Sequence, residues 1–216
     1  MVDSQQSPFN ESRALRLFPT FVWKADLRHE IFRAINERIV ARLGEMRRSS
    51  PQPPSGRAWQ SDQELHRLAE FHELVSCING VTENVLDHLK IRYDAFEITA
   101  CWANVNAPGS AHRSHSHPNN FLSGVYYVKT QDGADTINFH DPRSQTGIIR
   151  PPVTELTADN TDQVVVNVVD GTLLLFPSWL HHSVDPNQSD EERISISFNI
   201  MFSSYSESMS RPLWEA

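Results

Sequence analysis

Residues 193–199 read Arg-Ile-Ser-Ile-Ser-Phe-Asn, a strict alternation of polar and apolar side chains. A period of two is typical of a β-strand, because successive side chains point to opposite faces of a sheet. The apolar face, Ile194 to Ile200 in steps of two, must meet a core or a layer of helices. The polar face, Arg193 to Asn199, must meet either water or a polar cavity. This strand alone leaves both open.

Five other segments favour strands because they are rich in aromatic and β-branched residues: 96–106, 122–128, 136–140, 164–169 and 172–176. Helical spacing of apolar residues instead predicts helices over 27–46 and 71–89, and a short helix capped by Ser61. No crossover helix separates the strands, so we expect antiparallel pairing. The pattern predicts a mainly β fold, a sandwich or barrel, supported by N-terminal α-helices.

The composition is that of an ordinary globular protein, with 216 residues, two cysteines and a formal net charge of -8. We expect one domain over residues 1–216, with a mainly helical support region (1–92) and a β core (93–205). The negative charge argues against nucleic acid as a partner, because neutralising phosphates needs clustered Lys and Arg. No apolar run approaches the ~20 residues of a membrane span. The polar N-terminus does not read as a signal peptide. A cytoplasmic protein without membrane contact is expected, and its oligomeric state is unreadable.

Two histidine-rich stretches stand out, Ala111–Asn120 (AHRSHSHPNN) and Trp179–Val184 (WLHHSV). Imidazole is a common ligand for iron, zinc and copper. His115 and His117, two residues apart, point to the same side of an extended chain. His112 is three residues from His115 and should point elsewhere, so we expect it behind the ligands or at the surface.

The second stretch follows a strongly apolar strand and a proline, and His182 lies 65 residues after His117. The double-stranded β-helix, a jelly-roll, cupin-like barrel, has this arrangement. In that fold a His-x-His motif at the end of one strand lies beside a His that follows a later strand. Arg193 follows, with Ser195 on the same face of its strand. An inward cation and a nearby hydroxyl would bind a carboxylate through charge-assisted hydrogen bonds.

This combination resembles the iron(II)- and 2-oxoglutarate-dependent oxygenases, whose usual pattern is His-x-Asp or His-x-Glu, a distal His, and an Arg-x-Ser about ten residues later. A closer likeness is to a bacterial and phage group of such oxygenases. The blocks that carry it are 17–23, 104–128, 139–143, 176–187 and 193–199.

The resemblance implies a dioxygenase that uses O2 and 2-oxoglutarate, hydroxylates a substrate and releases succinate and CO2. It implies His115, His117 and His182 as iron(II) ligands, with His182 favoured over His181. It implies Arg193, Ser195 and Tyr127 as residues that bind 2-oxoglutarate, with Tyr126 not excluded. No catalytic residue beyond the metal centre is implied. The substrate, a small molecule or an amino-acid or protein side chain, is left open.

The departure from the family pattern is that His117 stands where the carboxylate ligand usually lies. Three alternatives remain: His117 itself is the third ligand, which we favour; a carboxylate such as Asp141 completes the site; or the position takes an exogenous ligand. Arg143 could contact substrate, although an ion pair with Asp141 is the simpler expectation. Trp102, Asn104 and Asn106 alternate onto one face and could line the pocket.

Two other functions stay open. A cupin-type dioxygenase or isomerase would need no 2-oxoglutarate, but the cupin glutamate position holds Phe121 or Leu122, and the Arg-x-Ser pair is foreign to cupins. A nonenzymatic sensor of metal or of a small acid would use the same pocket residues.

Overall fold

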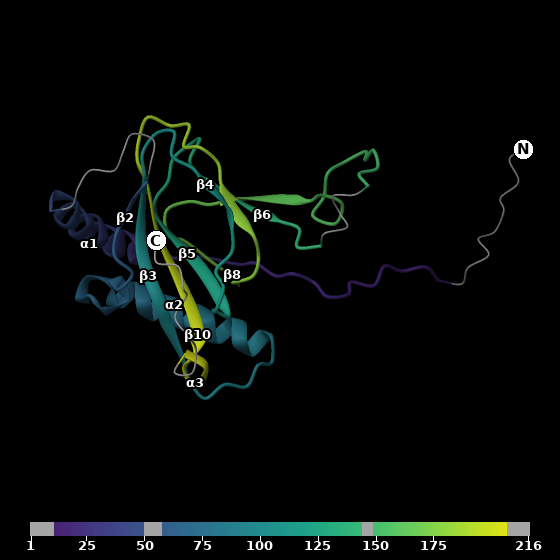
Figure 1. The fold of residues 1–216 in the computed structure, drawn as a ribbon, viewed down its shortest axis with the longest axis horizontal. Coiled ribbons are helices and arrows are strands. Elements are labelled where there is room, and N and C mark those ends of the chain that lie inside the picture. The colour runs from purple at the N-terminus through teal and green to yellow at the C-terminus, as the bar shows by residue number, and fades with distance from the viewer. Residues whose placement is uncertain (1–10, 50–57, 144–148, 207–216) are drawn as a thin grey trace, which may run out of the picture.

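The computed structural model describes residues 11–49, 58–143 and 149–206, whose strands form two antiparallel sheets (Figure 1). The larger sheet has the order β1-β8-β5-β10-β3-β2, and the smaller has the order β4-β9-β6-β7. The strands are β1 (Trp23–Asp26), β2 (Trp59–Gln60), β3 (Phe96–Asn106), β4 (His112–His115), β5 (Leu122–Lys129), β6 (Thr136–His140), β7 (Gln163–Asn167), β8 (Thr172–Pro177), β9 (His182–Val184) and β10 (Arg193–Phe202). Together they confirm the predicted mainly β architecture.

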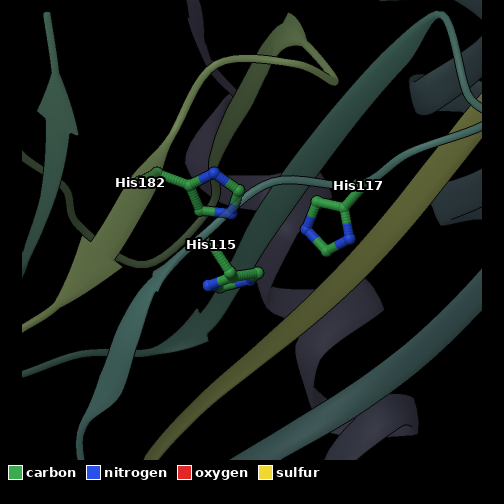
Figure 2. A group of neighbouring side chains, drawn as sticks. All are labelled: His115, His117 and His182. Carbon is green, nitrogen blue, oxygen red and sulfur yellow. The ribbon is translucent and has the colours of Figure 1, made fainter. Parts of the chain in front are cut away.

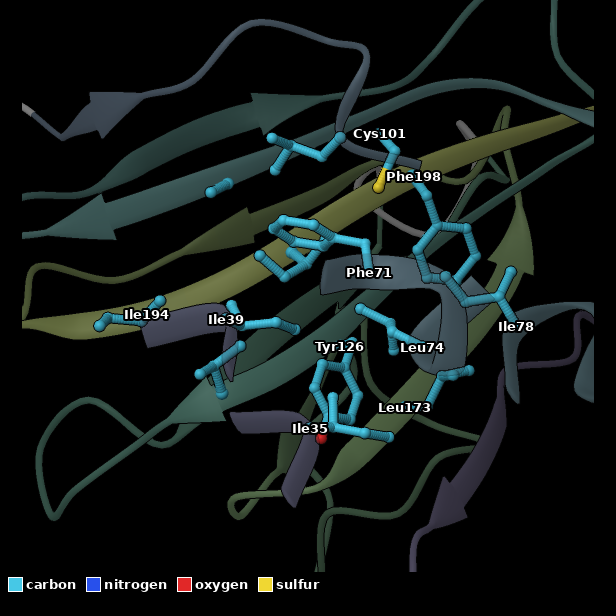
Figure 3. Packing of buried hydrophobic residues seen from close by; sticks show 14 of the residues in the cluster. Ile35, Ile39, Phe71, Leu74, Ile78, Cys101, Tyr126, Leu173, Ile194 and Phe198 are labelled. Atoms are coloured by element: carbon cyan, nitrogen blue, oxygen red, sulfur yellow. The ribbon is translucent and has the colours of Figure 1, made fainter. Parts of the chain in front are cut away.

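Two long helices cover one side of the larger sheet. They are α1 (His29–Arg48) and α2 (His72–His88), accompanied by the short helices η1 (Leu65–Arg67), η2 (Ala69–Phe71) and α3 (Ser203–Ser206). Figure 3 shows Ile35 and Ile39 of α1 packed with side chains from the strands. No helix of the described residues is both long and apolar enough to cross a bilayer.

The strand β10 has two chemically different faces, and both are buried. Ile194, Ile196 and Phe198 belong to the core beneath the helices. Arg193 and Ser195, on the opposite face, are also buried, at 3% and 5% exposed, and they line a pocket between the sheets. The polar face of this strand therefore meets a polar cavity rather than open water, a choice that the alternation of its side chains alone did not decide.

Alternation also divides the neighbouring strand β5 between two cores. Tyr126 lies in the core beneath the helices, and Tyr127 in the smaller core between the sheets, with Phe139 and Phe176. Both tyrosine rings are fully buried. A strand covered on both faces reads as a continuous apolar run, and this explains the sequence LSGVYYV at residues 122–128.

Some short elements differ from the sequence predictions. The strands β1 and β2 come from the first 92 residues and pair at the two edges of the larger sheet. Ser61 is not a helix cap: its hydroxyl accepts a hydrogen bond from the backbone N–H of Ala103, which holds the segment after β2 against β3. The Pro-rich stretch at 50–56 lies outside the described residues.

Close packing at the centre of the sheet requires a glycine at position 124. A Cβ added to Gly124 would collide with the ring of Phe198 and would lie 2.6 Å from the carbonyl oxygen of Leu174. Both neighbours are fully buried, so neither can move without disturbing the core. Gly80, inside α2, is the opposite case, because an added Cβ meets nothing within 4 Å.

Gly124→Ala is expected to lower the free energy of unfolding by about 1–3 kcal/mol, the usual cost of overpacking a core. Gly80→Ala should instead raise it by about 0.5–1 kcal/mol, because alanine is the better residue inside a helix. Urea denaturation of both variants measures the difference. Equal stabilities of the two variants would contradict this description of the packing.

Candidate metal centre

Three histidine side chains converge at one end of the cavity between the sheets. His115 ends β4, His117 follows it, and His182 begins β9, and one ligand nitrogen of each lies within 4.8 Å of the others. Figure 2 shows the three rings facing a common point. His182 is 4% exposed, whereas the adjacent His181 is exposed. The structure thus groups the three histidines that the sequence singled out, and it turns His181 away.

Strand pairing accounts for this convergence. His115 and His182 are directly opposite partners in the antiparallel pair β4–β9, and their ring centroids are 4.4 Å apart. His117 lies beyond the strand end, where its backbone N–H donates to the carbonyl of Ser178. That bond ties the segment after β4 to the turn before β9. Two segments that are distant in sequence are therefore fixed side by side.

The backbone sets the tautomer of two of these rings. His115 Nδ1 lies 2.7 Å from the carbonyl oxygen of Arg113, and His182 Nδ1 lies 2.9 Å from that of Leu180. A carbonyl only accepts, so Nδ1 of each neutral ring carries the proton and Nε2 keeps its lone pair. Such a bond on the far nitrogen is the usual way in which a metal-binding histidine is oriented.

The charge state also suits a metal. Burial lowers the pKa of His182 to about 3, and the neighbouring histidines add to the effect. Burial, together with His115, lowers the pKa of His117 to about 4. Both rings are therefore neutral near pH 7, which is the form that coordinates a cation.

His112 faces the pocket, so the prediction that it points elsewhere is wrong, but as expected it is not one of the three clustered histidines. Between His112 and His115 the strand β4 advances three residues, while its partner β9 advances only two, from Val184 to His182. The extra residue is a β-bulge, which brings both imidazoles to the same side. His112 lines the pocket, and burial, with Arg193 and His115, lowers its pKa to about 4.

Asp141 is not part of the histidine group. Its carboxylate pairs with Arg143, at 2.6 Å between Nη2 and Oδ2, and also accepts the backbone N–H of Arg143. The guanidinium lowers the pKa of Asp141. This ion pair is the simpler of the two roles that the sequence left open for Arg143. Among the described residues no carboxylate joins the three histidines, and no acidic side chain lines the pocket.

Arg193, Tyr127 and Ser195 form the other end of the same pocket. The guanidinium carbon of Arg193 lies 5.1 Å from the centroid of the Tyr127 ring. Arg193 Nε and the Tyr127 hydroxyl are buried and make no well-aligned hydrogen bond among the described residues, although the Arg193 side chain lies close enough to this hydroxyl to act on its pKa. Burial raises the pKa of Tyr127, so this hydroxyl stays protonated and can donate. Tyr126 is excluded from the pocket, because its hydroxyl donates to Asn36 beneath the helices.

Asn187 fixes the two loops that flank Arg193. Its side-chain nitrogen donates to the carbonyls of Asn106, at 3.0 Å, and of Glu191, at 2.7 Å. Its backbone N–H and carbonyl pair with Ser110 and Gly109. The end of β3 and the segment before β10 are thereby joined, and the start of β10 is held in place.

A polar wall completes the pocket. Gln60 donates to Asn104 at 2.7 Å, and Asn104 donates to Ser197 at 3.0 Å. The Trp102 ring lies 5.7 Å from that of His117. Trp102, Asn104 and Asn106 all line the pocket, as their alternation predicted.

Residues 100–199 match the family model described as "Putative 2OG-Fe(II) oxygenase". This match indicates a 2-oxoglutarate- and iron(II)-dependent oxygenase, an oxidoreductase, in agreement with the sequence motifs. The matched segment contains the three histidines, Tyr127, Arg193 and Ser195. No curated protein sequence matches the chain significantly.

Solved structures show the same fold at low identity. A Pseudomonas putida prolyl-4-hydroxylase is 15% identical, with a TM-score of 0.59 over 85% of this chain and 93% of that one. A Trichoplax adhaerens prolyl hydroxylase, in complex with a peptide fragment of hypoxia inducible factor, is 13% identical, with a TM-score of 0.60 over 88% and 87%. HygX of Streptomyces hygroscopicus, with nickel and 2-oxoglutarate bound, is 12% identical, with a TM-score of 0.57 over 85% and 83%. These similarities confirm the double-stranded β-helix.

Sequence reasoning missed two residues of this region. The inward direction of His112 could not be predicted, because a β-bulge reverses the side-chain alternation and no residue type in the sequence indicates the bulge. The role of Asn187 could not be predicted, because its side chain bonds to backbone carbonyls 81 and 4 residues away in the sequence. Its place after Asp185-Pro186 reads only as a turn.

Asn187→Ala is expected to lower the free energy of unfolding by about 1–3 kcal/mol, because it removes the buried side-chain hydrogen bonds that join the end of β3 to the segment before β10. Asn160, which is exposed and also bonds the backbone, supplies the control, and Asn160→Ala should cost less than about 0.5 kcal/mol. Chemical denaturation compares the two variants. Equal losses would show that Asn187 does not hold the loops.

Proposed function

We propose that the chain is an iron(II)- and 2-oxoglutarate-dependent dioxygenase that hydroxylates an organic substrate and releases succinate and CO2. One observation carries this proposal: a cluster of three histidines lines one pocket together with the buried Arg193, which has no carboxylate partner among the described residues. The first suits a divalent metal, and the second calls for an anion. A 2-oxo diacid supplies a chelating end for the metal and a carboxylate for the guanidinium.

His115, His117 and His182 hold iron(II) in this proposal. The donor set fits, because each ring is directed at the common point and two of them present Nε2. Iron(II), when bound, supplies the redox chemistry that couples O2 and decarboxylation of the 2-oxo acid to substrate oxidation. Imidazole ligands add no negative charge, so the carboxylate beside the keto group of the cosubstrate would supply negative charge at the metal, while its distal carboxylate compensates Arg193.

Arg193, Ser195 and Tyr127 bind the distal carboxylate of 2-oxoglutarate. The guanidinium and two hydroxyls can donate to its oxygens, and Phe176 and Leu174 behind them exclude water. Tight placement of the 2-oxo acid fixes its orientation relative to the three histidines. The contribution of the protein is therefore positioning and water exclusion.

The substrate is an uncharged polar compound or side chain in this proposal, because Gln60, Asn104 and Ser197 offer only hydrogen bonds. The prolyl hydroxylase structure with a bound peptide supports a protein substrate, and the HygX structure with hygromycin B supports a small molecule. The net charge of -8 speaks against nucleic acid. The motif blocks quoted from the sequence support the bacterial and phage group of these oxygenases.

Wild-type protein should show a weak visible charge-transfer band when iron(II) and 2-oxoglutarate are added without oxygen, and should form succinate in air. Arg193→Ala removes the anion site and is expected to raise the KM for 2-oxoglutarate at least about 100-fold. Arg150→Ala, at an exposed ion pair, serves as control. No band and no succinate with the wild type would favour a cupin-type enzyme or a sensor.

The third ligand is tested by metal affinity. His117→Ala should weaken iron(II) binding at least about 100-fold, more than the 10- to 100-fold typical of residues behind the ligands. Asp141→Ala should change it less than about threefold, because that carboxylate is paired with Arg143. Anaerobic titration with a competing chelator measures both. The reverse order of effects would assign the third position to Asp141.

A further inference from the structure

A second cavity, here named the rear chamber, lies behind Arg193. It has a volume of about 140 Å³, and the residues relevant to its chemistry are Asn106, Ser110, Asp135, Asp185, Asn187 and Arg193. It shares Asn106, Val184 and Arg193 with the histidine pocket, but none of the three clustered histidines lines it. The proposed function does not use this space.

Three residues that line the rear chamber each have a buried side-chain atom without a hydrogen-bond partner among the described residues. These atoms are Asn106 Nδ2, Ser110 Oγ and Arg193 Nε. The three residues are only 2%, 1% and 3% exposed. Leaving such a group unpaired costs about 1–3 kcal/mol. All three atoms can donate, so the chamber calls for an acceptor.

The fold holds Ser110 rigidly without using its hydroxyl. The Ser110 backbone N–H donates to Ala107, and its carbonyl accepts from Asn187, both at 3.0 Å. Removing the hydroxyl therefore leaves the loop bonds intact. Asn106 is fixed from the opposite strand, because it is the direct partner of Arg193 in the β3–β10 pair.

We propose that the rear chamber binds a carboxylate group, with Ser110 and Asn106 donating to it beside Arg193. A carboxylate offers two oxygens with about four acceptor positions, enough for all three donors. Its charge compensates a guanidinium that has no acidic partner among the described residues. The group belongs to a separate small carboxylic acid, because the proposed function places the distal carboxylate of 2-oxoglutarate in the histidine pocket with Tyr127 and Ser195, which do not line the chamber.

Two acidic residues limit the ligand. Asp135 is half-buried and Asp185 is exposed, and both line the chamber. Their charges oppose an anion, so the chamber suits a single carboxylate rather than a polyanion. Asp135→Asn should for the same reason tighten binding, by about twofold or more.

The first arm of the test needs neither metal nor the proposed function. Metal-free protein is titrated with acetate and followed by NMR shifts, comparing wild type with Ser110→Ala and Asn106→Ala. The control is Ser123→Ala, since Ser123 is equally buried but bonded to Asn199 outside both cavities. A separate acid predicts at least fivefold weaker acetate binding in the two chamber variants and a change below twofold in the control.

The second arm uses zinc-loaded protein with 2-oxoglutarate and with 2-oxobutyrate, which lacks the distal carboxylate. Ser110→Ala should change the affinity for either 2-oxo acid less than twofold. A loss of at least fivefold for 2-oxoglutarate alone would show that the chamber is the distal end of the cosubstrate site, and would overturn the proposal of a separate acid. Failure of wild type to bind 2-oxoglutarate would count against the proposed function alone, because the acetate arm is independent of it.

Thermal unfolding checks that each variant folds. Ala134→Leu, which fills the chamber without removing a donor, should reproduce the loss if a serine or asparagine variant is unstable. The proposal is also overturned if the folded chamber variants bind acetate as the wild type does. The chamber then holds only water.

Discussion

The constraint around which the pocket is arranged is a buried guanidinium, that of Arg193, which has no carboxylate partner in the part of the chain that the structure describes. Arg193 begins the central strand β10 and is 3% exposed, and no acidic side chain lines the pocket that it faces. Taking such a charge out of water is costly unless an anion compensates it. Asn187 joins the loops on either side of Arg193. The anion site that we propose lies at this point.

The alternation of polar and apolar side chains along β10 places Arg193 in the pocket between the sheets. The apolar face of the strand anchors it beneath α1 and α2, while the polar face lines the cavity between the sheets. The pair β4–β9 closes the cavity and carries His115 opposite His182. A metal and an anion can thus be bound at two ends of one pocket. Because imidazole side chains carry no negative charge, a metal held by the three histidines would leave its charge to be balanced by the ligand rather than by the protein.

Much of this could be predicted from the sequence, because local patterns carry it. Period-two alternation reveals both faces of β10, and the spacing of His115, His117 and His182 suggests one site. What escaped depends on long-range geometry. The bulge that turns His112 inward depends on the register between β4 and β9. The hydrogen bonds of Asn187 join the end of β3 to the segment before β10, which are far apart in sequence. The edge strands β1 and β2 are too short to show a period.

The measurement that tests the central claim most directly is a crystal structure with iron(II) and 2-oxoglutarate, using anomalous scattering at the iron edge. The account predicts one iron coordinated by His115, His117 and His182, with the distal carboxylate of 2-oxoglutarate on Arg193. Iron coordinated by Asp141 in place of His117, or 2-oxoglutarate bound away from Arg193, would contradict it.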